Sequence, residues 1–330
     1  MTDMIDIRDE NYKTTKYVAI ILFTIFVLCG IISNTLMVTV LLYRGKNNQY
    51  NREFVLIALQ LIISHFTAFL PQMAVVLPEL LQTKNNSYAN ETTWINRIFA
   101  TFNTFSLFSV LHFSFLLALN RSVLLILPKY YSFFKSTKLY FLIAFIWSSG
   151  LAITFIDFYC CTRRFLVWNL TWEGNCTKSG EIGDIWWRVR YCWILFIPNA
   201  MFITYVAIFC NIRRKRHSTI SDNQNQRITK TNTNDENNTV KVNRCERSML
   251  IQAALNCAVL EIGAVIFHFM PSIMIGIFGD GIYLVTMIFT NSYVIFICIT
   301  LPIIHFIYSK QSRDIIKYHL YKWLQLNNEQ

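Results

Sequence analysis

The stretch YVAIILFTIFVLCGIISNTLMVTVLLY, residues 17–43, contains no aspartate, glutamate, lysine or arginine. A helix needs about 20 mostly apolar residues to cross a bilayer, so this stretch is long enough to span one. Five further runs lack the same four residue types, and one more is interrupted only by Glu261: residues 54–78, 98–120, 139–156, 191–212, 281–309 and 248–279. Lipid offers no partners to backbone polar groups, which favours helices. We therefore expect an all-α, polytopic membrane protein with a seven-transmembrane-helix bundle over residues 17–309.

The composition of the whole chain agrees with a membrane protein. Of its 330 residues, 54% are apolar and 15% are charged, whereas a soluble domain carries about 25% charged residues. The catalytic patterns GxSxG and HExxH and the P-loop are absent, and the six histidines show no metal-ligand spacing. We therefore predict no catalytic residue, no metal site and no cofactor, and we do not expect an enzyme.

The distribution of charge predicts the orientation in the membrane. With the N-terminus outside, the inner segments hold 20 of the 30 lysines and arginines and 7 of the 19 acidic residues. Short cytoplasmic loops carry an excess of lysine and arginine, so the N-terminus is expected outside and the C-terminus in the cytoplasm, at the plasma membrane. The net charge of +11 is then a signature of topology, and no nucleic-acid partner is expected.

The expected segments follow from this orientation. Residues 1–16 form an extracellular N-terminus, residues 213–247 a third cytoplasmic loop, and residues 310–330 a cytoplasmic tail that contains a short amphipathic interfacial helix. Four glycosylation sequons fall in the expected first and second outer loops, which supports the orientation. Their acceptor residues are Asn85, Asn90, Asn169 and Asn175.

Three cysteines gather at the outer end of the fourth span, in an oxidising compartment where a disulfide can persist. The pair Cys161–Cys176 is the first candidate for a bridge. Cys160 and Cys192 are alternatives, because spacing alone does not determine the pairing.

Polar residues inside the spans are candidates for a ligand site. Glu261 lies near the middle of the bilayer, where a carboxyl group is costly and is expected to face the bundle. His268, seven residues further on, shares its face about 10 Å outward, and Asn103 lies in the outer half of the third span. A purely structural role is the alternative for each. Asp157 ends the fourth span, where a charge costs little, and is interpreted as structural. The scarcity of ionisable groups suggests a small, weakly charged ligand.

Short motifs along the chain carry a resemblance to a known family. They are Ala118-Leu119-Asn120-Arg121, Leu127-Pro128-Lys129-Tyr130-Tyr131, Gly30 with Asn34, Trp147, Pro198 and Pro271. In these motifs the chain resembles a rhodopsin-like G-protein-coupled receptor and, more narrowly, the nematode serpentine chemoreceptors. Class x is the most similar, through Gln60 and the loop with Cys160, Cys161, Trp168, Trp172 and Cys176. The resemblance extends from Tyr17 to Leu326.

The resemblance implies a chemosensory receptor in the cilia of sensory neurons. A small external ligand would bind in the outer half of the bundle, and a heterotrimeric G protein would couple at the inner end through Arg121 and Asn120. The chain departs from the general receptor pattern at three positions. Asn120 replaces the acidic neighbour of the arginine, Gln60 replaces the sodium-site aspartate of the second span, and His305 replaces the tyrosine of the NPxxY segment.

Two other classes of membrane protein remain open from the sequence. One is a seven-span ligand-gated channel subunit with the N-terminus inside, and the other is a transporter. An inside N-terminus would put the basic segments outside and the four sequons in the cytosol, so topology separates these classes.

Overall fold

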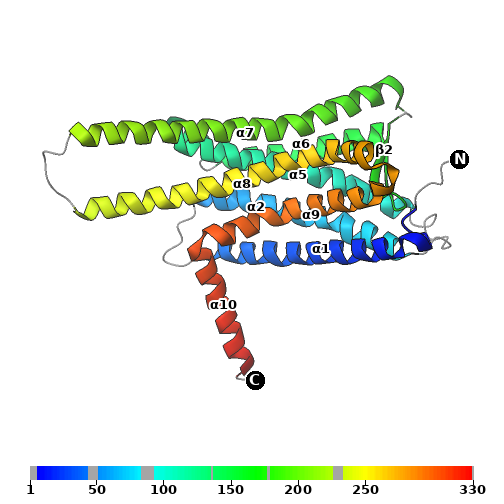
Figure 1. The fold of residues 1–330 in the computed structure, drawn as a ribbon. Helices are drawn as coiled ribbons and strands as arrows, with labels where there is room; N and C mark the ends of the chain where they lie inside the picture. The colour runs from blue at the N-terminus through cyan, green and yellow to red at the C-terminus, as the bar shows by residue number, and fades with distance from the viewer. Residues whose placement is uncertain are drawn as a thin grey trace.

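The computed structural model describes residues 6–43, 51–82, 93–134, 137–176, 179–225 and 233–328. Within these residues, seven helices are long and apolar enough to cross a membrane, and they form a single elongated bundle (Figure 1). The spans are α1 (Lys13–Leu42), α2 (Arg52–Pro71) with η2 (Gln72–Val76) and α3 (Leu77–Leu81), α5 (Thr93–Leu125), α6 (Thr137–Cys160), α7 (Gly180–Asn225), α8 (Thr233–Phe278) and α9 (Tyr283–Tyr308). The predicted all-α, seven-helix fold is confirmed.

The connecting elements are short. Single turns lie at η1 (Glu10–Tyr12), η3 (Pro128–Phe134) and η5 (Asp280–Ile282), and two strands, β1 (Thr162–Leu166) and β2 (Thr171–Asn175), form a hairpin. A last helix, α10 (Lys310–Asn328), leaves the bundle at a steep angle to α9 (Figure 1). This is the position in which a helix would lie along the membrane surface. We call the hairpin end of the bundle the outer end and the α10 end the inner end, after the predicted topology.

Helix α5 lies at the centre of the bundle. In its most apolar stretch 67% of the residues are buried, against 11% for the span that ends at Phe278 in α8. One apolar cluster occupies the inner half, around α2, α5 and α7, and a second occupies the outer half, where α1 and α9 meet the hairpin. The outer part of α8, from Ala254 to Phe278, is therefore the least buried of the seven spans.

Polar side chains tie the helices together inside the bundle. Asn34 of α1 donates to the carbonyl of Cys298 in α9 and bonds to His65 Nδ1 of α2, at 3.0 Å in both cases. Trp147 Nε1 of α6 donates to Gln60 Oε1 of α2 over 2.9 Å. Buried polar groups that are paired in this way cost little and restrict how the helices rotate.

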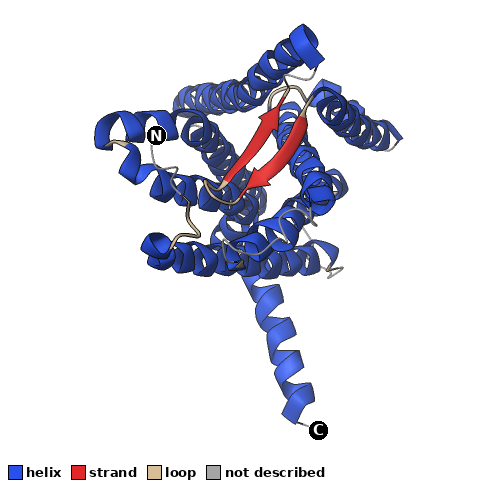
Figure 2. Cartoon of the chain, turned by 90° about the vertical axis from the view of Figure 1, so that its right-hand side faces the viewer, coloured by secondary structure: helices blue, strands red, loops and turns tan. Residues whose placement is uncertain are grey.

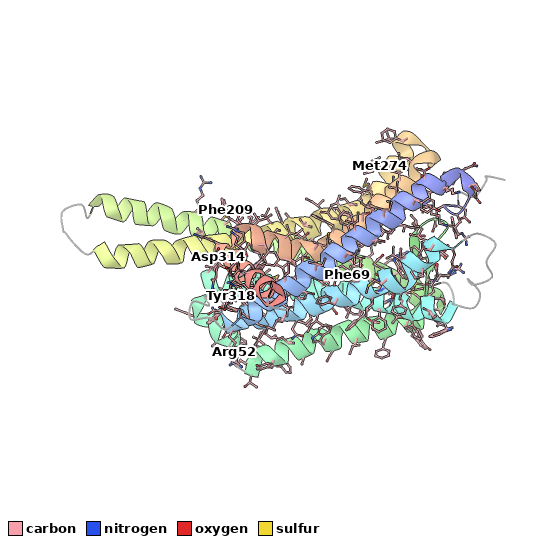
Figure 3. All side chains as sticks on the ribbon, turned by 90° about the horizontal axis from the view of Figure 1, so that it is seen from below. Arg52, Phe69, Phe209, Met274, Asp314 and Tyr318 are labelled. Atoms are coloured by element: carbon pink, nitrogen blue, oxygen red, sulfur yellow. A yellow bond between two sulfur atoms is a disulfide. The ribbon has the colours of Figure 1, made fainter. Side chains whose placement is uncertain are left out.

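A close approach between α1 and α2 requires Gly30. A Cβ at this position would lie 2.4 Å from the ring of Phe69, which is labelled midway along the bundle in Figure 3. The aromatic ring therefore packs directly against the backbone of α1. We expect Gly30→Ala to force these two helices apart, because the surrounding core is close-packed.

The hairpin lies across the outer end of the bundle (Figure 2). Its strands are antiparallel, with Phe165 opposite Trp172, and a disulfide between Cys161 and Cys176 closes its open end. This is the pairing that ranks first from the sequence. Cys160 and Cys192, the two alternatives, are free thiols.

The helices α7 and α8 extend beyond the expected spans. Residues 213–247 were expected to form a loop, whereas α7 continues to Asn225 and α8 begins at Thr233. Both extensions project from the inner end (Figure 1). The reason is that extending an existing helix adds one hydrogen bond per residue, and this stretch contains neither proline nor glycine to stop it.

Candidate functional site

The hairpin is anchored in the outer mouth of the bundle by side-chain amides. Asn96 of α5 accepts from the N–H of Phe165 at 2.7 Å and donates to the carbonyl of the same residue at 3.0 Å. At the turn, Asn291 of α9 donates to the carbonyl of Leu170 over 2.8 Å. The side chain of Leu170 is fully buried, and its φ of +57° lies in the left-handed region that non-glycine residues rarely adopt. The hairpin therefore covers the mouth in a defined position.

Beneath the hairpin, Asp157 of α6 is the centre of a buried cluster and is only 1% exposed. Its Oδ2 lies 2.6 Å from Arg163 Nε and accepts from Thr104 Oγ1 at 3.0 Å. Its Oδ1 accepts from Trp186 Nε1 at 3.1 Å and lies 3.9 Å from Arg190 Nε. The expectation that the charge of Asp157 costs little at this position is therefore wrong, because the hairpin and α7 fold over it, whereas its contacts fit the structural role expected from the sequence.

The two arginines come from different elements. Arg163 belongs to β1 and Arg190 to α7, and each is only 8% exposed. Burial lowers the pKa of Arg163, and the charge of Asp157 opposes that shift. A small cavity beside this ion pair is bordered by Arg97 and Phe158, with the Arg97 guanidinium 4.7 Å above the Phe158 ring.

Aromatic and imidazole side chains continue the site along the contacts between α5, α7 and α8. His112 of α5 accepts from Trp193 Nε1 of α7 through Nε2 at 3.0 Å. One helix further, His268 of α8 meets Tyr191 of α7 edge-to-face, with ring centroids 4.6 Å apart. We call the region around these four side chains the aromatic seam. His268, predicted as a ligand residue, lies in this seam.

The other two predicted ligand residues lie nearby but are not joined to His268. Glu261 is partly buried in α8, and its Oε2 has no hydrogen-bond partner among the described residues. Asn103 is partly buried in α5, and its carbonyl accepts from Ser106 Oγ at 3.0 Å. Asn103 immediately precedes Thr104, which contacts Asp157. The described contacts do not bring Glu261, His268 and Asn103 together.

At the inner end of α5, Arg121 is buried rather than extended to the surface. It is 5% exposed, and its guanidinium lies 4.4 Å above the ring of Phe54 in α2. Asn120 beside it is buried, and its Nδ2 has no hydrogen-bond partner among the described residues. The buried guanidinium is thus held between α5 and α2.

His305 links three helices at this end. Its Nδ1 lies 3.3 Å from Gln252 Oε1 of α8, and its Nε2 lies 3.0 Å from Ser312 Oγ of α10. Ser312 Oγ in turn donates to Ser309 Oγ at 2.7 Å. His305 is therefore a buried polar junction between α8, α9 and α10.

Of the four candidate glycosylation residues, the structure describes two. Asn175 is exposed at the open end of the hairpin. Asn169 is partly buried at the turn, where its Oδ1 accepts from both the N–H and the hydroxyl of Thr171. Asn85 and Asn90 lie outside the described residues.

Comparisons with known proteins agree with the fold. No protein-family model matches the sequence, and no curated protein matches it significantly. Among solved structures, squid rhodopsin superposes with a TM-score of 0.70 at 11% sequence identity, over 94% of this chain and 86% of the rhodopsin chain. The chain is a multi-pass membrane protein with the seven-helix fold of rhodopsin. At this identity the likeness defines the fold and not the function.

Proposed function

We propose that the protein is a G-protein-coupled chemosensory receptor. A small external ligand binds in the outer half of the bundle, and a heterotrimeric G protein is activated at the inner end. The observation that carries this proposal is the environment of Arg121. Arg121 directly follows residues 98–120, which contain no aspartate, glutamate, lysine or arginine, so it lies at the inner end of the third span. It is buried among helices that must separate to expose it.

The chemistry of Arg121 suits a reversible contact with a partner helix. In the closed arrangement its guanidinium is held over Phe54, where cation–π attraction stabilises it. Movement of α8 away from α5 would expose the planar donors to the backbone carbonyls at the end of a G-protein helix. A lysine offers a point charge without this planar set of donors and is not equivalent.

The junction at His305 supplies the restraint on that movement. Gln252 of α8 bonds to His305 of α9, so an outward displacement of α8 breaks this bond. A ligand that prefers the open arrangement shifts the equilibrium by its difference in affinity for the two states. Asn120 cannot form the charge-assisted bond to Arg121 that an acidic residue would form, so we expect basal activity without ligand.

The narrower assignment is also a proposal. The segment from Ala118 to Tyr131 supports a nematode serpentine chemoreceptor located in sensory cilia. Gln60 and the loop from Cys160 to Cys176 support class x within that group. The charge distribution supports an extracellular N-terminus and a cytoplasmic C-terminus at the plasma membrane. An N-terminal tag should therefore be labelled on intact cells. Labelling only after permeabilisation would contradict this orientation and favour the inverted channel.

The test of G-protein activation needs no ligand. The full chain is placed in lipid nanodiscs with purified heterotrimeric G proteins, and basal nucleotide exchange is measured. We expect Arg121→Lys to lose most of this exchange at an unchanged protein yield. Arg52→Lys is the matched control, because Arg52 lies exposed at the same end (Figure 3) and bonds only to Tyr140 among the described residues. Full exchange by the Arg121 variant would reject the proposed role.

Glu261, His268 and Asn103 are proposed to contact the ligand. Once a screen with a second-messenger readout has identified a ligand, Glu261→Gln, His268→Ala and Asn103→Ala should shift its potency and leave the surface level unchanged. If the three variants only lower the surface level, these residues are structural.

A further inference from the structure

The buried cluster beneath the hairpin does not balance its charge. It contains one carboxylate, Asp157, and two guanidinium groups, Arg163 and Arg190, each at most 8% exposed. The cluster therefore carries a net charge of +1 away from water. A buried charge without a partner is strongly unfavourable, and a protein retains one only where another group compensates it.

Asp157 has little capacity left for Arg190. Its two oxygens already receive Thr104 Oγ1 and Trp186 Nε1 as hydrogen-bond donors and Arg163 at 2.6 Å. Arg190 Nε stands 3.9 Å away, beyond hydrogen-bond distance. The carboxylate is thus the closer partner of Arg163 and the more distant ion-pair partner of Arg190, and its single negative charge leaves one of the two positive charges uncompensated.

Among the described residues, no acidic side chain other than Asp157 forms an ion pair with Arg190. Its guanidinium lies between the ring of Phe108 on α5 and the ring of Trp187 on its own helix, 5.9 and 5.6 Å from their centroids. Within the described part of the chain no hydrogen bond reaches it, and its buried Nε, like that of Arg163, has only the ion-pair contact with Asp157. Aromatic faces attract a cation but do not accept its directed N–H groups as a carboxylate does.

Two buried ring nitrogens of the aromatic seam also have no hydrogen-bond partner among the described residues. His112 Nδ1 faces away from the bond that its other nitrogen makes to Trp193, and His268 Nε2 is unpartnered beside Tyr191. His112 and Arg190 share contacts with the ring of Phe108. Unsatisfied buried groups are rare in folded proteins, and three of them along one set of helix contacts point to a missing occupant.

We propose that Arg190 binds the anionic group of the ligand, and that the ligand is a small organic monocarboxylate with an apolar or aromatic body. The single excess positive charge matches one carboxylate, which a guanidinium can bind through two parallel hydrogen bonds. The aromatic seam would enclose the body of the molecule, and it borders the outer part of α8, the least buried of the seven spans. This deepens the proposed receptor function and replaces the weakly charged ligand that composition alone suggests.

A purely structural role for Arg190 makes the opposite prediction for the ligand-free protein. If Arg190 stabilises Asp157, Arg190→Gln lowers the melting temperature, as Arg163→Gln must do. If Arg190 is an uncompensated charge held for a ligand, Arg190→Gln raises or preserves the melting temperature, because it removes a costly buried charge. The comparison of the two arginine variants therefore requires no ligand.

The binding test uses two matched pairs of probes on the full chain in nanodiscs, at constant ionic strength. Phenylacetate is compared with phenylacetamide, and hexanoate with hexanamide, and the melting temperature is followed by tryptophan fluorescence. We expect at least one carboxylate to raise the melting temperature of the wild type by about 2–4 °C more than its amide. Arg190→Gln should abolish this difference, and Arg164→Gln, on the exposed face of the hairpin, should retain it.

Two results would overturn the proposal. One is the absence of any difference between carboxylates and amides in the wild type, and the other is a loss of melting temperature in Arg190→Gln as large as that in Arg163→Gln. Neither measurement involves a G protein. Failure here therefore leaves the nucleotide-exchange test of Arg121 unaffected, and failure of that test leaves carboxylate binding intact.

Discussion

Replacing Asp157 by asparagine should destabilise the protein more than any exposed change in the hairpin. The substitution preserves the shape of the side chain but leaves the guanidinium groups of Arg163 and Arg190 buried without a countercharge. Removing one partner of a buried ion pair costs about 3–5 kcal/mol. With an unfolding entropy of about 2.1 cal/mol/K per residue, each kcal/mol lowers the melting temperature of a chain of this length by about 1.4 °C, so we expect a loss of roughly 4–7 °C.

The assay is thermal unfolding of the full chain in nanodiscs, followed by tryptophan fluorescence. Glu173→Gln is the matched control, because Glu173 pairs with Arg164 at 3.4 Å on the exposed face of the hairpin. Exposed pairs contribute about 0–1 kcal/mol, so the control should change the melting temperature by less than about 2 °C. A similar loss of melting temperature in Asp157→Asn and Glu173→Gln would show that burial does not determine the free-energy cost of removing a carboxylate.

A second variant separates charge from shape. Adding Arg163→Gln to Asp157→Asn removes one of the two uncompensated charges, and the double variant should recover part of the lost stability. The physical reason is that the neutral amides at positions 157 and 163 cost less to bury than an unpaired guanidinium, and they do not repel the charge of Arg190. The reasoning is refuted if Asp157→Asn melts within about 2 °C of the wild type, or if the double variant is less stable than the sum of the single changes.

Three further predictions concern the hairpin and the inner end. Cys176→Ser should open the hairpin and lower the amount of protein at the cell surface. The control Cys192→Ser removes a free and exposed thiol and should match the wild type. Equal surface levels of the two variants would reject this role for the disulfide. With the first-outer-loop sequons removed, Asn175→Gln should abolish the mobility shift on glycosidase treatment and Asn169→Gln should not, because a glycan at the docked turn would prevent docking. Asn120→Asp should lower basal nucleotide exchange, since a carboxylate restrains Arg121 more strongly than an amide; unchanged or higher exchange would count against that restraint.

The number of membrane helices is a property of the sequence alone. Each helix must satisfy its backbone hydrogen bonds within its own segment, so the presence of a span depends on local composition and not on its neighbours. The interfacial helix after Ser309 is recognised for the same reason. The pairing of Cys161 with Cys176 is also nearly local, because both residues belong to one short loop.

The ends of α7 and α8 are less well predicted from composition. The polar tract between Arg213 and Arg247 has too little apolar content to be recognised as a helix, yet it contains nothing that terminates one. Helices already formed in the bundle therefore continue into this tract, and the packed part of each helix determines where it begins.

Which polar side chains meet was decided only by the tertiary structure. Asp157, Arg163 and Arg190 come from α6, β1 and α7, and their contact requires the hairpin to fold back over the outer end of the bundle. Glu261 and His268 share a helix face by spacing, but the described contacts leave them apart. Apolar composition determines which segments enter the membrane. The rotation and depth of each helix, which determine the polar contacts, arise from close packing among side chains of all seven helices and the hairpin at once.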